Sequence, residues 1–163
     1  MTRRIIGLVI VGPPATTTTG SLLRAYNIWH TVKRLGSINV KYLPITYPID
    51  VLLNLRSIIK GDIIIISGVS PWISSLILLI GKLFSKCVII DVHGSPYYEY
   101  IMSNRVELLR KILLYLNEYI SYKLSRNIIV ASRGLISILY TYFRIRSNKK
   151  NIYVLPNSVS YLF

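Results

Sequence analysis

The chain has 163 residues, with 20 Lys and Arg against 6 Asp and Glu, and its formal net charge is +14 at pH 7. This length suits one domain that buries about 70% of the surface of the unfolded chain. The 52% hydrophobic content excludes a disordered chain. The only cysteine, Cys87, excludes an internal disulfide and fits a reducing compartment. We expect Cys87 to be a small core residue at the start of a strand.

The strong positive charge restricts the class of partner and not the fold. It fits anionic lipid, nucleic acid or a phosphorylated substrate. The basic residues do not form a tail, because 6 lie in residues 1–50, 4 in 51–100 and 10 in 101–163. We therefore expect a folded surface with a basic final third and not a nucleic-acid-binding arm.

Apolar runs and amphipathic segments alternate along the whole chain. The predicted strands cover 4–11, 40–45, 62–67, 86–92, 127–131 and 152–155, and the predicted helices cover 21–35, 50–60, 71–84, 104–125 and 132–143. Short connections between such alternating elements require parallel strands joined by helical crossovers. We predict an α/β fold: a Rossmann-like, open, mostly parallel sheet of about six strands with helices on both faces.

One uncharged segment, 63–81, is long enough to suggest a membrane span. Gly68 and Pro71 interrupt it, which favours a strand, a turn and a helix that begins at the proline. The N-terminal arginine pair is followed by only seven apolar or Gly residues before Gly12, too few for a secretory signal. We expect a cytoplasmic protein, with a peripheral position on the inner face of the membrane as an alternative.

The turn before the first helix contains candidate ligand contacts. In open parallel sheets, ligands bind beyond the carboxyl ends of the strands, and the turns at 12–20, 67–71 and 93–104 should share that edge. Backbone N–H groups around Thr19 and Gly20 would favour a phosphate there. Neither a dinucleotide fingerprint nor a P-loop occurs in the chain, so a simple helix-capping turn is the alternative.

His93 lies one residue past the fourth predicted strand, at the same edge. A neutral imidazole there can donate or accept one well-placed hydrogen bond, and we predict a functional role over a purely structural one. Asp91 points the same way along the strand or caps a turn. Glu99 and Glu107 have the Glu-x7-Glu spacing of sugar-transfer enzymes, but they straddle a loop and a helix start, so we interpret the spacing as a coincidence. No Asp-x-Asp motif and no His or Cys cluster indicates a metal site.

The predicted helix near the end of the chain is apolar around most of its circumference. One stripe comprises Leu109, Leu113, Leu116, Ile120 and Leu124, and another comprises Leu108, Ile112, Tyr115, Tyr119 and Tyr122. One stripe must cover the sheet. The tyrosine-rich stripe, basic at both ends, would then lie on a membrane surface or be covered by a missing domain or a second copy.

These features together resemble the amino-terminal domain of GT-B glycosyltransferases, particularly retaining family 4, over essentially the whole chain. The resemblance rests on the turn with Gly20, on His93-Gly94 after a strand, on Glu118 followed by Ile128-Ile129-Val130-Ala131-Ser132, and on Val154-Leu155-Pro156-Asn157-Ser158-Val159. The sequence departs from the family at two places. Thr19 precedes Gly20 where paired glycines are usual, and Ser158 follows Asn157 where a glycine is usual.

The resemblance implies an amino-terminal domain over 1–155 and, over 156–163, the start of a linker to a nucleotide-sugar-binding domain that is absent from the chain. It assigns Thr19 and Gly20 to the donor diphosphate, His93 to the transferred sugar, Tyr97 and Tyr98 to the acceptor, and Asn157 to the linker side of the cleft. The nucleotide-sugar is a substrate, the acceptor is a sugar or a lipid-linked molecule, and neither a metal nor a cofactor is implied. We expect the fragment alone to be inactive.

Two other classes of function compete with this one. The chain could be a non-catalytic, acceptor- or membrane-binding half of a two-chain glycosyltransferase. Charge alone would also suit a nucleic-acid-binding module, whose affinity would fall steeply with salt. Aromatic residues are not interleaved with Lys and Arg on a recognisable nucleic-acid-binding fold, so nucleic acid is not an expected partner.

Overall fold

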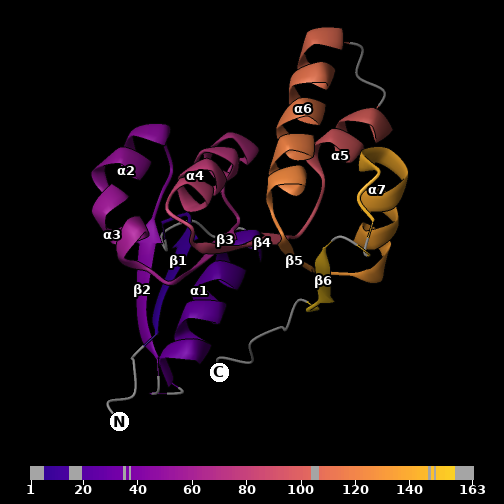
Figure 1. Cartoon of the computed structure of the whole chain (residues 1–163). Coiled ribbons are helices and arrows are strands. Elements are labelled where there is room, and N and C mark those ends of the chain that lie inside the picture. The colour runs from indigo at the N-terminus through magenta and orange to yellow at the C-terminus, as the bar shows by residue number, and fades with distance from the viewer. Residues whose placement is uncertain are drawn as a thin grey trace.

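The computed structural model describes residues 6–14, 20–34, 36, 38–103, 107–146, 148 and 150–156, with only the backbone at 20–22. The described elements, in chain order, are β1 (Gly7–Gly12), α1 (Gly20–Arg34), β2 (Asn39–Pro44), α2 (Pro48–Leu53), α3 (Leu55–Lys60), β3 (Ile63–Ser67), α4 (Pro71–Leu83), β4 (Cys87–Val92), α5 (Pro96–Met102), α6 (Leu108–Leu124), β5 (Asn127–Val130), α7 (Arg133–Phe143) and β6 (Asn151–Val154). Strands and helices alternate as the sequence predicts (Figure 1).

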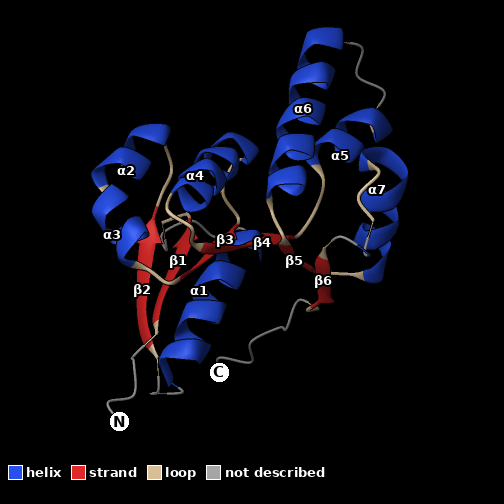
Figure 2. Ribbon diagram, viewed as in Figure 1, coloured by secondary structure: helices blue, strands red, loops and turns tan. Residues whose placement is uncertain are grey.

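The described strands form one six-stranded sheet in the order β2-β1-β3-β4-β5-β6, and every pair is parallel. The predicted fold class is confirmed. The chain moves from β1 to β2 in one direction along the sheet and then returns past β1 to β3, so β1 is the point at which the strand order reverses. Because parallel crossovers are right-handed, α1 covers one face and the other helices gather on the opposite face (Figure 2).

The consecutive isoleucines of β3 show why the strands have no polar face. Ile64 and Ile66 belong to the larger core cluster, under α4 and its neighbouring helices, and Ile65 belongs to a smaller cluster under α1. A strand buried on both faces needs an apolar residue at every position. The same geometry explains the apolar segment 63–81, in which β3 ends at Ser67 and α4 begins at Pro71.

Local structure departs from the sequence predictions at three places. The helix predicted over 50–60 is two helices, α2 and α3, with the break at Asn54. The predicted loop over 93–104 contains α5, whose amino end is capped by Ser95 Oγ accepting from the N–H of Tyr98. Cys87, expected in the core, is exposed. None of the described helices combines the length and the apolar character needed to cross a membrane.

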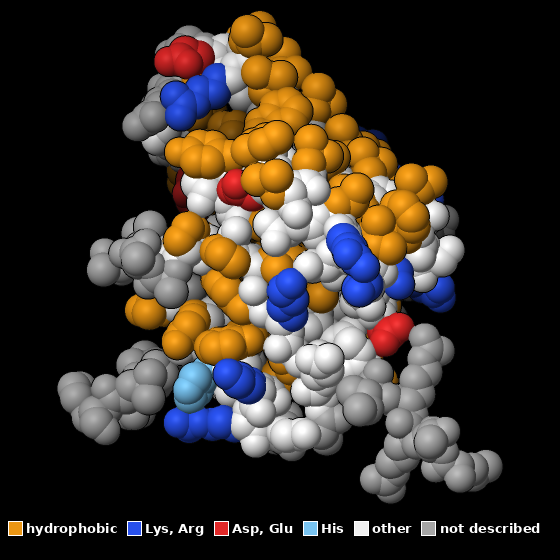
Figure 3. Space-filling view, turned by 90° about the vertical axis from the view of Figure 1, so that its left-hand side faces the viewer, with side chains coloured by type: hydrophobic (Ala, Val, Ile, Leu, Met, Phe, Trp, Pro, Cys, Tyr) orange, Lys and Arg blue, Asp and Glu red, His pale blue; other side chains and the backbone are white. Residues whose placement is uncertain are grey.

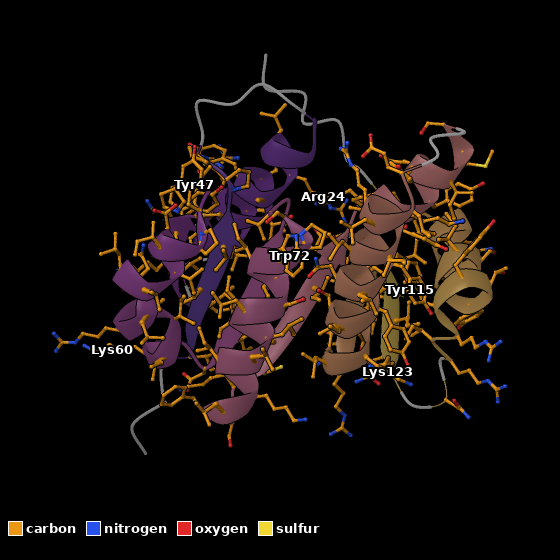
Figure 4. All side chains as sticks on the ribbon, turned by 90° about the horizontal axis from the view of Figure 1, so that it is seen from above. Arg24, Tyr47, Lys60, Trp72, Tyr115 and Lys123 are labelled. Atoms are coloured by element: carbon orange, nitrogen blue, oxygen red, sulfur yellow. The ribbon has the colours of Figure 1, made fainter. Side chains whose placement is uncertain are left out.

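The two apolar stripes of α6 divide differently from the prediction, because the tyrosines pack against the core and the leucines are mostly exposed. Tyr115 stacks on Phe143 of α7 with ring centroids 5.5 Å apart, and it lies between α6 and α7 in Figure 4. Tyr122 is also in the core. Most of the leucine-rich stripe is exposed, and so are Leu108 and Ile112 at the start of the tyrosine-rich stripe, which was predicted to be free for a membrane. Flat aromatic rings fill the space between α6 and α7 by stacking.

Candidate functional site

A cavity of about 320 Å³ lies where the carboxyl ends of β3 and β4 meet the helices above them. Its walls come from the turn before α4, from the end of β4 and the turn that follows it, and from the buried side of α6. They include Gly68, Ser74, Asp91, His93, Glu99, Glu118 and Tyr122. The cavity is therefore at the edge where open parallel sheets bind ligands, as the sequence predicts for the turns at 67–71 and 93–104.

Asp91 forms a buried ion pair at this edge. Its side chain is fully buried and that of Arg24, from α1, is 7% exposed. Arg24 Nε lies 2.9 Å from Asp91 Oδ2, and Arg24 Nη2 lies 2.9 Å from Oδ1. Such a two-pronged contact fixes the carboxylate in orientation as well as in position. Asp91 thus pairs with α1 on the far side of the sheet and does not cap a turn.

Ser67, at the end of β3, connects this carboxylate to His93. Ser67 Oγ donates to Asp91 Oδ2 at 2.7 Å and lies 3.2 Å from His93 Nε2. The strand register places Ser67 directly beside Asp91. The hydroxyl proton of Ser67 is directed to Asp91, so Ser67 Oγ can only accept a hydrogen bond from His93. The proton of the imidazole must therefore be on Nε2. Asp91 Oδ2, at 3.6 Å from the same nitrogen, favours the same tautomer.

The surroundings of His93 favour the neutral imidazole. Burial lowers its pKa below the ordinary value of 6.5; Asp91 acts in the opposite direction, and the Arg24 guanidinium adds to the lowering. With the proton on Nε2, Nδ1 carries a lone pair, and this buried atom has no hydrogen-bond partner among the described residues. A buried acceptor without a partner is unusual in folded proteins. His93 is therefore held as an acceptor for a donor that the described chain does not supply.

A second buried carboxylate, Glu118 of α6, organises the turn after His93. It accepts hydrogen bonds from Ser95 Oγ at 2.7 Å, from the N–H of Tyr97 and from Tyr122 Oη at 2.9 Å. Burial raises the pKa of Glu118 above its ordinary value of 4.5, and these hydrogen bonds oppose the rise. Through these contacts α6 fixes the segment that carries His93 and begins α5.

Arg24 also contacts the carboxyl-terminal end of the described chain. Its Nη2 donates to the backbone oxygen of Leu155 at 2.7 Å, immediately after β6. The backbone N–H of Leu155 in turn bonds to Val130 of β5. One guanidinium thus joins α1, β4 and the residue that follows the last described strand.

The structure brings together some of the predicted site residues and separates others. His93 lines the cavity, whereas Tyr97 and Tyr98 lie towards α7, where both rings contact Tyr142. Glu99 lines the cavity in their place. Gly20 begins α1, next to the strand at which the sheet order reverses. Thr19 and Asn157 are outside the described residues.

Sequence reasoning missed the partners of His93. It singled out neither Arg24 nor Ser67, and it used Glu118 only as a family marker. One signal was present: a lone aspartate in an apolar central strand needs a cation or hydrogen-bond donors when it is buried. Within the described ranges, no group of three His, Cys, Asp or Glu side chains could hold a metal ion.

No family model matches the chain, and no curated protein matches it either.

Proposed function

We propose that this chain is the amino-terminal, acceptor-side half of a GT-B glycosyltransferase, of family 4 type, that moves a sugar from a nucleotide-sugar donor to an acceptor hydroxyl. The observation that carries the proposal is His93: an imidazole, held by Ser67 and Asp91, at the wall of the cavity beyond the strand ends. A sugar is rich in hydroxyl donors, and Nδ1 of His93 is a buried acceptor without one.

His93 would act by positioning. An imidazole that accepts one sugar hydroxyl at a fixed angle orients the sugar towards the acceptor, and orientation is a large part of the rate gain when two substrates meet. Glu99 is exposed and lines the same cavity, so it is a candidate for acceptor hydroxyls, together with the more peripheral Tyr97 and Tyr98.

The donor diphosphate would lie at the start of α1. Gly20 follows the strand at which the sheet order reverses, and phosphates bind at helix amino ends in such positions. Thr19 is assigned to the same diphosphate contact only by the resemblance to GT-B glycosyltransferases. Residues 1–155 would form the domain described above, and 156–163, with Asn157, would lead to a second domain that binds the nucleotide and neutralises the leaving diphosphate.

A second candidate is a non-catalytic, acceptor-binding half that works with a separate catalytic chain at the inner face of a membrane. The observation that favours it is the leucine-rich stripe of α6, which the described chain leaves exposed. In both proposals the acceptor is a sugar or a lipid-linked molecule, and in neither does the chain act alone.

The test uses the full-length native polypeptide. UDP-glucose, UDP-N-acetylglucosamine and GDP-mannose are offered in turn, and release of the nucleoside diphosphate is measured with and without candidate acceptors. With an active pair, His93→Ala should lower turnover by about 10²-fold or more, the scale of a lost positioned hydrogen-bonding group. The matched control is His30→Ala, which removes the other histidine, on α1. Unchanged turnover in His93→Ala would remove His93 from the reaction.

A further inference from the structure

The outer side of α6 carries a row of exposed apolar side chains. This α6 ridge comprises Leu108, Leu109, Ile112, Leu113, Leu116 and Ile120. At its amino-terminal end the exposure is greatest, with Leu108 68% and Leu109 72% accessible. Their spacing puts them within about 140° of the helix circumference, given 100° per residue. A contiguous apolar patch of this kind on a folded protein marks an interaction surface.

The ridge also projects from the molecule. The amino-terminal half of α6 rises above the helices that cover the same face of the sheet (Figure 1). Hydrophobic side chains crowd that upper part of the molecule in the space-filling view of Figure 3, where basic and acidic side chains lie beside them, and further basic side chains lie below. A projecting helix can meet a flat surface without obstruction by the rest of the domain.

Basic side chains accompany the ridge at both ends of α6. Arg110 and Lys111 are exposed in the first turns, and Lys123 is exposed in the last turn, in line with the ridge. The exposed acid nearest to them is Glu107, just before the helix, while Glu118 faces the cavity. An apolar stripe bordered by cations, on a chain of net charge +14, is complementary to an anionic apolar surface.

We propose that the α6 ridge docks this protein onto the surface of an anionic lipid bilayer. The helix would lie in the interface with its leucines among the acyl chains and its cations at the headgroups, without crossing the membrane. A second copy is a poorer occupant, because it would bring another +14 charge to the same patch. The cavity lies on the opposite side of the same helix. This inference does not depend on glycosyl transfer.

The experiment measures co-sedimentation of the complete chain with two kinds of vesicle, phosphatidylcholine alone and phosphatidylcholine mixed with phosphatidylglycerol. We expect binding to the anionic vesicles that weakens with salt. Leu109→Glu should lower the partition coefficient by about tenfold or more, because it replaces an inserted leucine by a charge. Its matched control is Leu83→Glu, at the far end of α4, where a leucine of 78% exposure lies off the ridge.

The charge contribution is tested separately. Lys111→Glu should weaken binding by more than about fivefold, since it removes one cation and adds an anion at the surface. Lys60→Glu is the control, because Lys60 points outward at the edge of the molecule remote from α6 (Figure 4).

Three results would overturn the proposal: equal binding to both kinds of vesicle, equal loss from the ridge variants and their controls, or no binding at all. Sedimentation velocity without lipid tests whether a second copy of the chain binds the α6 ridge instead. If the chain is a dimer that Leu109→Glu converts to a monomer while vesicle binding stays the same, the ridge is a self-association surface and the proposal fails.

Discussion

Two carboxylates are buried beside the same cavity, and the chain holds them in different ways. Asp91 faces a guanidinium and accepts hydrogen bonds from its Nε and Nη2 atoms. Glu118 has no cation beside it among the described residues and is held by a serine, a backbone N–H and a tyrosine. An ion pair keeps a group in one orientation, whereas neutral donors can hold a carboxylate whose pKa burial has raised.

The difference separates two tasks at the site. Asp91 and Ser67 set the tautomer of His93, which requires a fixed acceptor. Glu118 ties the turn after His93 to α6, which requires several acceptor positions at once. We infer that the first carboxylate orients the imidazole of His93 and that the second shapes the backbone that carries it.

The largest expected effect is that of separating the ion pair. Arg24→Met should lower the free energy of unfolding by about 3–5 kcal/mol, because it leaves Asp91 buried without its cation. Urea denaturation of the complete chain measures the change. Arg34→Met, in the exposed last turn of the same helix, is the matched control.

A double variant sharpens this prediction. Arg24→Met with Asp91→Leu removes both charges and should recover most of the lost stability, since a buried pair can often be replaced by apolar residues at little cost. A single Arg24→Met variant no less stable than the Arg34→Met control would contradict the role given to the pair.

The next effect concerns Glu118. Glu118→Gln should lower the free energy of unfolding by about 2 kcal/mol, because the amide NH₂ would face donors where the carboxylate accepts three hydrogen bonds. The control is Glu99→Gln, an exposed glutamate of the same cavity wall, with an expected change within about 0.5 kcal/mol. Equal effects at the two positions would show that Glu118 does not organise the turn.

The fold was predictable because its signals are local. The apolar run of β3 and the proline that begins α4 lie within a few residues of each other, and both elements were predicted near their observed bounds. Helix α5 was missed although Ser95 and Pro96 are typical of a helix start. Those residues were attributed to the loop after His93, and the seven residues of α5, about two turns, were too few to show periodicity.

The site was only partly predictable because its partners are distant in sequence. His93 was found from its position after a strand, but Arg24 and Asp91 are 67 residues apart. Their pairing depends on α1 lying across the sheet from α4. The exposed stripe of α6 could not be chosen from the sequence either, since both stripes are apolar. The choice depends on the packing of Tyr115 against α7.

The smallest expected effect is a pH dependence that His93 and Glu118 impose in opposite directions. The lowered pKa of His93 means that its contribution to stability is complete above the unfolded value of 6.5 and declines as the pH falls through 6.5 towards the lower folded value. The raised pKa of Glu118 means that its contribution is complete below 4.5 and declines as the pH rises through that value.

The two groups can be separated by substitution, because each acts in its own pH window. His93→Gln should remove the loss of stability that accompanies acidification just below pH 6.5, while His30→Gln, which removes the other imidazole, should retain it. Glu118→Gln should instead flatten the curve above pH 4.5. The free energy of unfolding measured by urea between these values gives both slopes. If His93→Gln kept the loss of stability on acidification, that loss would not come from His93. The imidazole would then take up a proton as readily in the folded chain as in the unfolded chain, and the tautomer imposed by Ser67 and Asp91 would not be the only state of the site.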